Sequence, residues 1–198
     1  NVTHFFREPE HFDRLTDILK EFQTEKRKKL RIWCAAASTG EEPYTLMMTI
    51  AEAIDLHTID FRLLATDINI DVLQKAKRGQ YNEIQVSKVP PFLRTRYFTK
   101  EKESGESVWT VRPELKDHIR FSQLNLIEFP YPLKNPADII FCRNVLIYFD
   151  LETRGKVIKE MENNLSQNGY LFLSRSENML GIKHGFDCLS GSVYRKRG

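Results

Sequence analysis

The sequence of 198 residues has few cysteines and no long hydrophobic run, and each of these shortages excludes a class of protein. Its three cysteines, Cys34, Cys142 and Cys188, show no CxxC spacing, which favours reduced thiols in a cytoplasmic protein. The five histidines show no metal-ligand spacing, so we expect no metal site. No stretch is apolar enough to span a membrane, and no signal-peptide pattern opens the chain.

Strong charge of one sign is also missing, because the formal net charge is only +3. This balance argues against a protein whose main role is to bind a nucleic-acid backbone. With 41% hydrophobic residues, the chain can bury the core of one domain of ordinary size. It begins at Asn1 and not at methionine, so we expect it to be a fragment of a longer protein.

Apolar runs and helical patterns alternate along the chain. The turn signals predict a helix over about 71–78, capped by Asn69 and ended by Gly79. Alternating strands and helices predict an α/β fold with a mostly parallel sheet, and the tail around Ser190–Gly191 predicts an antiparallel edge. The other predicted elements are strands at 30–36, 61–66, 119–126, 137–144 and 170–174, a helix from Pro43, and a long helix that carries Val157, Ile158, Met161 and Leu165 and ends at Gly169.

One region, 90–115, breaks this rhythm. It contains paired prolines, a charged turn around Gly105 and two strand-like pieces, "RYF" and "VWTV". These features predict a small antiparallel β-subdomain inserted into the main fold, although an irregular loop is the alternative.

The stretch "ASTGEEPY", Ala37 to Tyr44, follows the first predicted strand and has one glycine and two acids. Ligands of open parallel sheets bind beyond the carboxyl ends of the strands. Asp67 ends the second strand, where an acid can accept hydrogen bonds from both ribose hydroxyls of an adenosine. Glu41 and Glu42 would repel a pyrophosphate but attract a sulfonium and an ammonium, so S-adenosylmethionine (SAM) is favoured over a dinucleotide. In the alternative interpretation, the two acids only begin a helix.

The ends of two later strands carry further groups that could bind a ligand. Asn125 and Leu126 follow the third strand and could hold an adenine. Arg143 and Asn144 follow the fourth strand and could touch the cofactor, while Tyr148 could line the transfer site. Ordinary loop contacts are the alternative for each residue taken alone.

At these residues the chain resembles the bacterial chemotaxis receptor methyltransferases, which methylate glutamate side chains of methyl-accepting chemotaxis proteins. The matching pieces run in order along nearly the whole chain: "NVTHFFREPEHF" (1–12), "WCAAASTGEEPYTL" (33–46), "ATDI" (65–68), "NL" (125–126), "IIFCRNVLIYFD" (139–150) and "GYLFLSRSE" (169–177).

The resemblance implies a class I SAM-dependent methyltransferase fold, with S-adenosylhomocysteine (SAH) as product. Tyr148 would stand near the transferred methyl. The inserted β-subdomain would dock a receptor peptide, and the helical N-terminal domain of the family would be absent from this chain. The family's cofactor contacts fall on Asn1, Thr3, Arg7, Glu41, Asp67, Asn125, Leu126, Arg143 and Asn144.

The opening segment also has a residue-level interpretation. Phe5 and Phe6 can anchor it to the core and hold Asn1, Thr3 and Arg7 over the pocket, where the fork of Arg7 suits the carboxylate of the methionine arm. A frayed terminus is the alternative.

The predicted activity is SAM-dependent methylation of receptor glutamates, which suits a site without an obvious general base because glutamate is already ionised near neutral pH. The expected partner is the cytoplasmic domain of a chemotaxis receptor, with no nucleic acid and no membrane insertion. The alternatives are a non-catalytic relative that binds the cofactor or a receptor, and a methyltransferase with another substrate.

Overall fold

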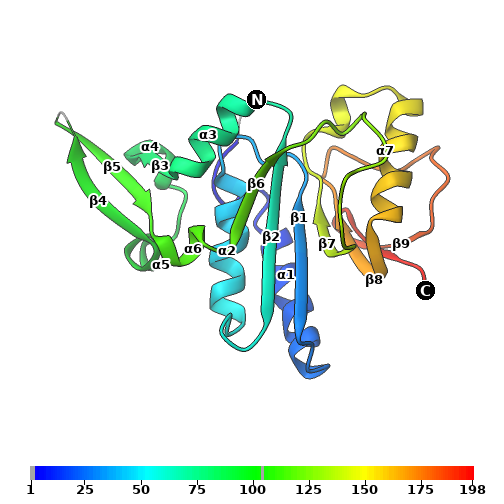
Figure 1. Cartoon of the computed structure of the whole chain (residues 1–198), viewed down its shortest axis with the longest axis horizontal. Helices are drawn as coiled ribbons and strands as arrows, with labels where there is room; N and C mark the ends of the chain where they lie inside the picture. The colour runs from blue at the N-terminus through cyan, green and yellow to red at the C-terminus, as the bar shows by residue number, and fades with distance from the viewer. Residues whose placement is uncertain (1–2, 104) are drawn as a thin grey trace.

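The computed structural model describes residues 3–103 and 105–198, which form a seven-stranded sheet with helices on both faces (Figure 1). The strand order is β6-β2-β1-β7-β8-β10-β9. β10 is antiparallel to its neighbours β8 and β9, and the other strands pair in parallel, which confirms the predicted fold class. The strands are β1 (Lys29–Cys34), β2 (Asp60–Asp67), β6 (Ile119–Gln123), β7 (Ala137–Phe141), β8 (Leu165–Phe172), β9 (Phe186–Ser190) and β10 (Val193–Lys196).

Two apolar clusters lie on opposite faces of the sheet, as the alternation of side chains along a strand requires. Ile32 of β1 packs with the residues of α1 and α2, while its neighbour Trp33 packs with those of α7. None of the helices in the described parts of the chain combines the length and apolar character needed to cross a membrane. The helices are α1 (Glu10–Thr24), α2 (Glu41–Ala53), α3 (Ile70–Arg78), α4 (Glu83–Val86), α5 (Pro91–Tyr97), α6 (Pro113–Lys116), η1 (Leu146–Tyr148) and α7 (Leu151–Asn163).

The caps of α3 confirm the sequence prediction. The Asn69 side chain accepts hydrogen bonds from the backbone N–H groups of Asp71 and Val72, and Gly79 ends the helix with φ of 61°.

The predicted end of the long helix is wrong. α7 begins after Asp150, whose carboxylate accepts the Thr153 N–H at 2.8 Å, and it ends at Asn163. Gly169 lies inside β8, where a Cβ atom would come within 2.9 Å of the Asp138 carbonyl oxygen. A close approach between strands, and not a helix stop, therefore requires this glycine.

The predicted insertion is a three-stranded antiparallel sheet, ordered β3-β5-β4, which projects away from the main sheet (Figure 1). Its strands are β3 (Gln80–Asn82), β4 (Phe98–Glu103) and β5 (Glu106–Val111). The hairpin of β4 and β5 confirms the prediction, but two of its details differ. Most of "RYF" belongs to the helix α5, and β3 precedes Pro90, outside the predicted bounds.

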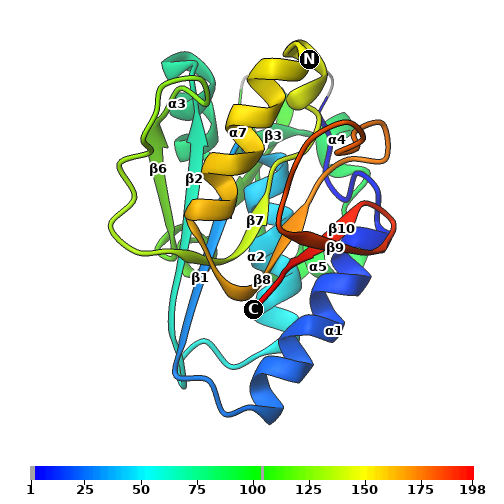
Figure 2. The same ribbon diagram turned by 90° about the vertical axis from the view of Figure 1, so that its right-hand side faces the viewer.

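The hairpin of β9 and β10 lies beside the start of α1 (Figure 2). His11 of α1 contacts the backbone carbonyl of Gly191, in the hairpin turn, through Nε2 at 2.6 Å. This contact joins a segment near the N-terminus to one near the C-terminus.

Candidate cofactor site

A cavity of about 540 Å³ opens beyond the carboxyl ends of β1, β2, β6 and β7. The chain passes from β1 to β2 on one side and reaches β7 on the other, so the cavity lies where the strand order reverses. Its volume falls within the range of small-molecule sites. It is lined by Thr3, His4, Arg7, Phe12, Ala35, Ala36, Ser38, Glu42, Asp67, Ile68, Asn69, Val72, residues 124–127, residues 143–145 and residues 147–149.

Asp67 lines the cavity at the end of β2, as predicted. Two backbone N–H groups orient its carboxylate: Ser38 donates to Oδ2 at 2.9 Å and Asn69 donates to Oδ1 at 3.0 Å. An ionised carboxylate has about four lone-pair positions, so two remain for a ligand. A pair of adjacent hydroxyls, as in a ribose, fits this acceptor.

Gly40 precedes α2 with φ of 100°, but it does not line the cavity. A Cβ atom there would lie 2.7 Å from the Tyr81 hydroxyl and 3.0 Å from Ala76 Cβ. The close neighbours that require a glycine here therefore belong to α3 and β3, and not to a ligand in the cavity.

The two acids of the turn face different surroundings. Glu41 is 2% exposed and does not line the cavity; it accepts hydrogen bonds from the Thr39 hydroxyl at 2.6 Å and the Gln85 amide at 3.3 Å. Glu42 lines the cavity. Glu42, and not the predicted Glu41, therefore faces the cavity. Sequence alone could not separate them, because both occupy the first turn of one helix.

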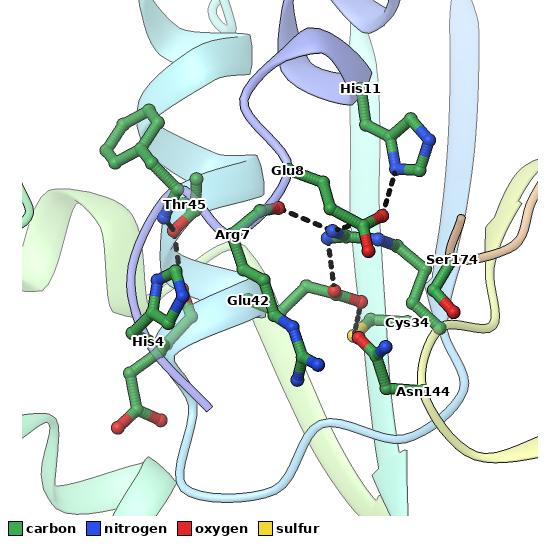
Figure 3. A network of polar contacts seen from close by, with 12 residues as sticks. His4, Arg7, Glu8, His11, Cys34, Glu42, Thr45, Asn144 and Ser174 are labelled. Carbon is green, nitrogen blue, oxygen red and sulfur yellow. Dashed lines mark hydrogen bonds and ion pairs between the residues drawn. The ribbon is translucent and has the colours of Figure 1, made fainter. Parts of the chain in front are cut away.

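Arg143 lines the cavity and forms ion pairs with Glu8 and Glu42. Figure 3 shows Glu8 and Glu42 within this network, with Cys34 beside Glu42. The Arg143 guanidinium donates to Glu42 at 2.7 Å, to Glu8 at 3.1 Å and to the backbone carbonyl of Arg7. Burial lowers the pKa of Arg143, but Glu42 and Glu8 outweigh it and hold the pKa above its usual value. Burial and the charge of Glu42 raise the pKa of the Cys34 thiol, which donates to Glu42 at 3.3 Å.

Arg143 lines the cavity, so its predicted contact with the cofactor stays a prediction, and the network gives it a second, structural role. Its side chain is 1% exposed and already serves two carboxylates. It orients Glu42 toward the cavity and ties the segment before α1 to the end of β7.

The opening segment is anchored as predicted. Phe5 is 1% exposed, with ring contacts to Tyr81 at 4.9 Å and Phe98 at 5.8 Å. The Phe6 N–H donates to the Thr45 hydroxyl at 3.2 Å. Thr3 and Arg7 line the cavity, whereas Asn1 lies outside the described residues.

Asn125 and Leu126 line the cavity after β6. The Asn125 amide is engaged within its own loop: Oδ1 accepts the Ile127 N–H at 3.2 Å, and Nδ2 donates to Glu128 at 2.9 Å. The loop therefore offers the cavity an apolar wall, with Leu126 and Ile127 in place of a free amide.

Asn144 and Tyr148 line the cavity from the segment after β7. Asn144 has φ of 59°, in the left-handed region, and Tyr148 is 63% exposed at the rim. Both positions agree with the predicted cofactor and transfer-site roles, which remain predictions.

One group of side chains in the described ranges could in principle hold a metal, with ligand atoms of Glu8, Glu10 and His11 within 4.8 Å of one another. Glu8 pairs with Arg143, and Glu10 pairs with Arg175 at 2.5 Å. Each carboxylate thus already has a cation, and a metal ion would face two guanidinium groups.

Several lining residues were missed by the sequence analysis. Ile68 directly follows β2, and Ile127, Ile147 and Phe149 lie in the segments after β6 and β7. Apolar residues in these segments were an available signal. His4 was identified only as part of a matching motif, and nothing in the sequence aims it at the cavity.

Comparison with known proteins identifies the family. The model of the "CheR methyltransferase, SAM binding domain" matches residues 1–195. The chain is 38% identical over 194 residues to the chemotaxis protein methyltransferase of Salmonella typhimurium and 37% identical over 194 residues to that of Escherichia coli, covering 98% of this chain and 66% of each relative. It is 36% identical over 203 residues to that of Borreliella burgdorferi, covering 99% of this chain and 70% of the relative.

A solved structure of magnesium protoporphyrin IX methyltransferase from Synechocystis PCC 6803 with bound SAH gives a TM-score of 0.44 at 15% identity, over 86% of this chain and 58% of that one. A structural similarity this low supports no conclusion about function. The chain spans about two thirds of the length of the first two relatives. On the family match over residues 1–195, the chain belongs to the CheR methyltransferases and contains their SAM-binding domain.

Proposed function

We propose that the protein transfers a methyl group from SAM to glutamate side chains of chemotaxis receptors, giving glutamate methyl esters and SAH. The relatives are named chemotaxis protein methyltransferases, which supports the reaction class and the receptor partner. A protein that methylates the cytoplasmic domain of a receptor would act in the cytoplasm.

The observation that carries the proposal is the arrangement of charged side chains around one cavity. Asp67 provides acceptors at the end of β2, and Glu42 provides a negative charge beside the turn. Arg7 lines the same cavity and brings a positive charge. These groups match, in turn, the ribose hydroxyls, the ammonium and sulfonium, and the carboxylate of SAM.

When bound, SAM supplies a methyl group on a positively charged sulfur, which an ionised carboxylate attacks without any proton transfer. The protein's residues then serve to align the carboxylate with the methyl group and to exclude water from the site. Asp67 and Glu42 fix the orientation of the cofactor, and the apolar wall of Leu126 and Ile127 keeps water away. Tyr148, exposed at the rim, would meet the incoming carboxylate.

A second candidate is methylation of a nucleophile that must first lose a proton. His4 lines the cavity and is the side chain among the described lining residues best suited to take that proton. Its Nδ1 contacts the Phe5 carbonyl at 3.0 Å, which leaves Nε2 for this role. The glutamate proposal needs no such base.

The test is to incubate the full-length protein with methyl-labelled SAM and receptor cytoplasmic fragments from the same organism. We expect label on the receptor as an ester that alkali releases as methanol. An Asp67→Ala variant is the control: losing charged hydrogen bonds worth about 1–3 kcal/mol should weaken SAH binding by about 5- to 150-fold.

Label that resists alkali, or that appears on another class of molecule, would overturn the glutamate proposal. A folded Asp67→Ala variant with unchanged SAH affinity would show that the ribose lies elsewhere.

A further inference from the structure

Glu177 is a buried carboxylate that the cofactor contacts do not explain. It lies in the segment "SRSENMLG", after β8, and is 3% exposed. It does not line the cavity.

Its two carboxylate oxygens accept five hydrogen bonds. Oε1 accepts the backbone N–H groups of Val145 at 2.8 Å and Leu146 at 2.7 Å. Oε2 accepts the backbone N–H of Asn144 at 2.9 Å, and also the N–H and hydroxyl of Ser174 at 2.9 and 2.7 Å. The carboxylate thus joins two loops at the carboxyl ends of β7 and β8.

The charge of Glu177 is balanced by these donors alone within the described ranges, where no cation lies within 4.0 Å of it. Burying a charge is costly unless it is paired or hydrogen-bonded. Three successive N–H groups pointing at one carboxylate form the kind of concave donor set that stabilises an anion. A neutral side chain of the same size could not hold all of them.

The backbone that Glu177 holds belongs to the segment after β7, which carries the cavity residues Asn144 and Tyr148. Asn144 has φ of 59°, a conformation that costs a residue other than glycine some strain and persists only where the surroundings enforce it. Leu146 begins η1, which ends at Tyr148, and the Tyr148 N–H donates to the Val145 carbonyl at 3.2 Å. Val145 itself provides no side-chain cap for η1. Glu177 therefore supplies the cap from another part of the chain.

We propose that Glu177 is a positioning residue for methyl transfer. By holding the backbone of Asn144, Val145 and Leu146, its carboxylate fixes where the Asn144 side chain and the Tyr148 ring stand at the cavity. This inference rests on the proposed function, because it concerns the same transfer site.

The experiment compares the full-length wild-type protein with Glu177→Gln in steady-state methylation of receptor fragments. The amide keeps one oxygen acceptor but turns an NH₂ group toward N–H donors, so the segment should lose its fixed geometry. We expect kcat to fall by about tenfold to a hundredfold, as for a small misplacement of reacting groups, with the KM for receptor little changed. Titration with SAH gives the number of competent sites, and kcat is calculated per site.

Two matched variants separate positioning from folding. Ser174→Ala removes a donor to the same carboxylate without touching the segment after β7, so its kcat per site should stay near that of the wild type. Glu177→Asp keeps the charge on a shorter side chain and should recover part of the loss. A merely structural role would lower the number of competent sites and leave kcat per site unchanged.

Hydrogen exchange of the wild-type protein gives a measurement that does not depend on any variant. The amides of Asn144, Val145 and Leu146 should be protected as well as strand amides, and Glu177→Gln should expose them. Fast exchange of these amides in the wild type, or an unchanged kcat per site in Glu177→Gln, would overturn the inference. A wild-type protein that methylates no receptor glutamate would instead overturn the proposed function.

Discussion

Glu41 and Glu42 are neighbours in the chain, yet only one of them lines the cavity. Successive residues of an α-helix point about 100° apart, so two acids in the first turn cannot share one environment. Glu41 turns toward Gln85 in the adjoining helix α4, and Glu42 turns toward Arg143 and the cavity. We therefore propose that Glu42, and not Glu41, faces the positive charge of the cofactor.

Glu42→Gln and Glu41→Gln therefore form a matched pair that preserves shape and removes one charge. We expect Glu42→Gln to weaken binding of SAM by about tenfold or more, because a charged hydrogen bond contributes about 1.5–3 kcal/mol. Glu41→Gln keeps a polar side chain for its two partners and should leave the affinity nearly unchanged. Calorimetric titration measures both.

Circular dichroism should show that both variants are folded, because Glu42 also pairs with the buried Arg143. The opposite result, with a large loss for Glu41→Gln and none for Glu42→Gln, would restore the assignment made from sequence.

At the residue scale, sequence predicted the groups that lie at strand ends but not their hydrogen bonds. Asp67 was identifiable because the end of a parallel strand is a ligand position, and the structure places it in the cavity. The engagement of Asn125 with Glu128 depends on loop geometry, which no periodicity encodes. Glu177 was missed because its partners after β7 lie more than 30 residues away along the chain.

The β4–β5 hairpin projects away from the main sheet (Figure 1). Its base packs into the core, since Phe98 is 2% exposed and contacts the ring of Phe5. Beyond the register pair of Lys100 and Trp109, none of the described residues between 101 and 108 lines the cavity. We propose that a receptor peptide docks on this outer part, because an exposed strand edge can pair with an extended chain.

Replacing residues 101–108 with Asn-Gly should shorten the hairpin without disturbing its base, because these two residues close a tight turn between directly opposed strands. We expect SAH affinity to stay within about twofold of the wild type, since no cavity contact is lost. The KM for receptor should rise if the receptor docks on the hairpin. Calorimetry and methylation kinetics on the full-length protein measure the two quantities.

Loss of SAH binding in a folded variant of this kind would show that the hairpin supports the cofactor site. Receptor kinetics equal to the wild type would place the docking surface elsewhere.

Elements were predictable where a local signal defines both ends. Asn69 and Gly79 delimit α3 as expected, because the cap and the left-handed glycine act within a few residues. The helix α5 was read partly as strand, since its seven residues are too few to show a helical period. Gly169 was read as a helix stop although its role is set by a neighbouring strand, which is a tertiary constraint.

Across the whole molecule, ion pairs and hydrogen bonds of a few side chains connect segments that are far apart in sequence. Glu8 precedes α1 and pairs with Arg143 after β7, while His11 contacts Gly191 in the turn between β9 and β10. The His11 ring also packs edge-on against Phe172 of β8 at 5.7 Å. The buried imidazole of His11 thus lies between Glu8, which pairs with Arg143, and the turn of the β9–β10 hairpin.

This imidazole should make the stability of the fold depend on pH. Burial, and then the positive charge of Arg143, lower the pKa of His11 below its usual value of 6.5, although Gly191 and Glu8 oppose the shift. The unfolded chain therefore takes up the proton at a higher pH than the folded protein does. The stabilising contribution is complete above about pH 6.5 and is lost as the pH falls below it toward the folded-state pKa.

We expect the urea midpoint of the wild-type protein to be lower at about pH 5.5 than at about pH 7.5, on opposite sides of the ordinary histidine pKa. His11→Gln removes the titrating group and should reduce this difference. His57 is exposed, so His57→Gln is the matched control and should keep the wild-type pH dependence. Equal differences in all three proteins would show that the acid sensitivity arises elsewhere. A difference lost only in His11→Gln would assign it to the contact between α1 and the closing hairpin.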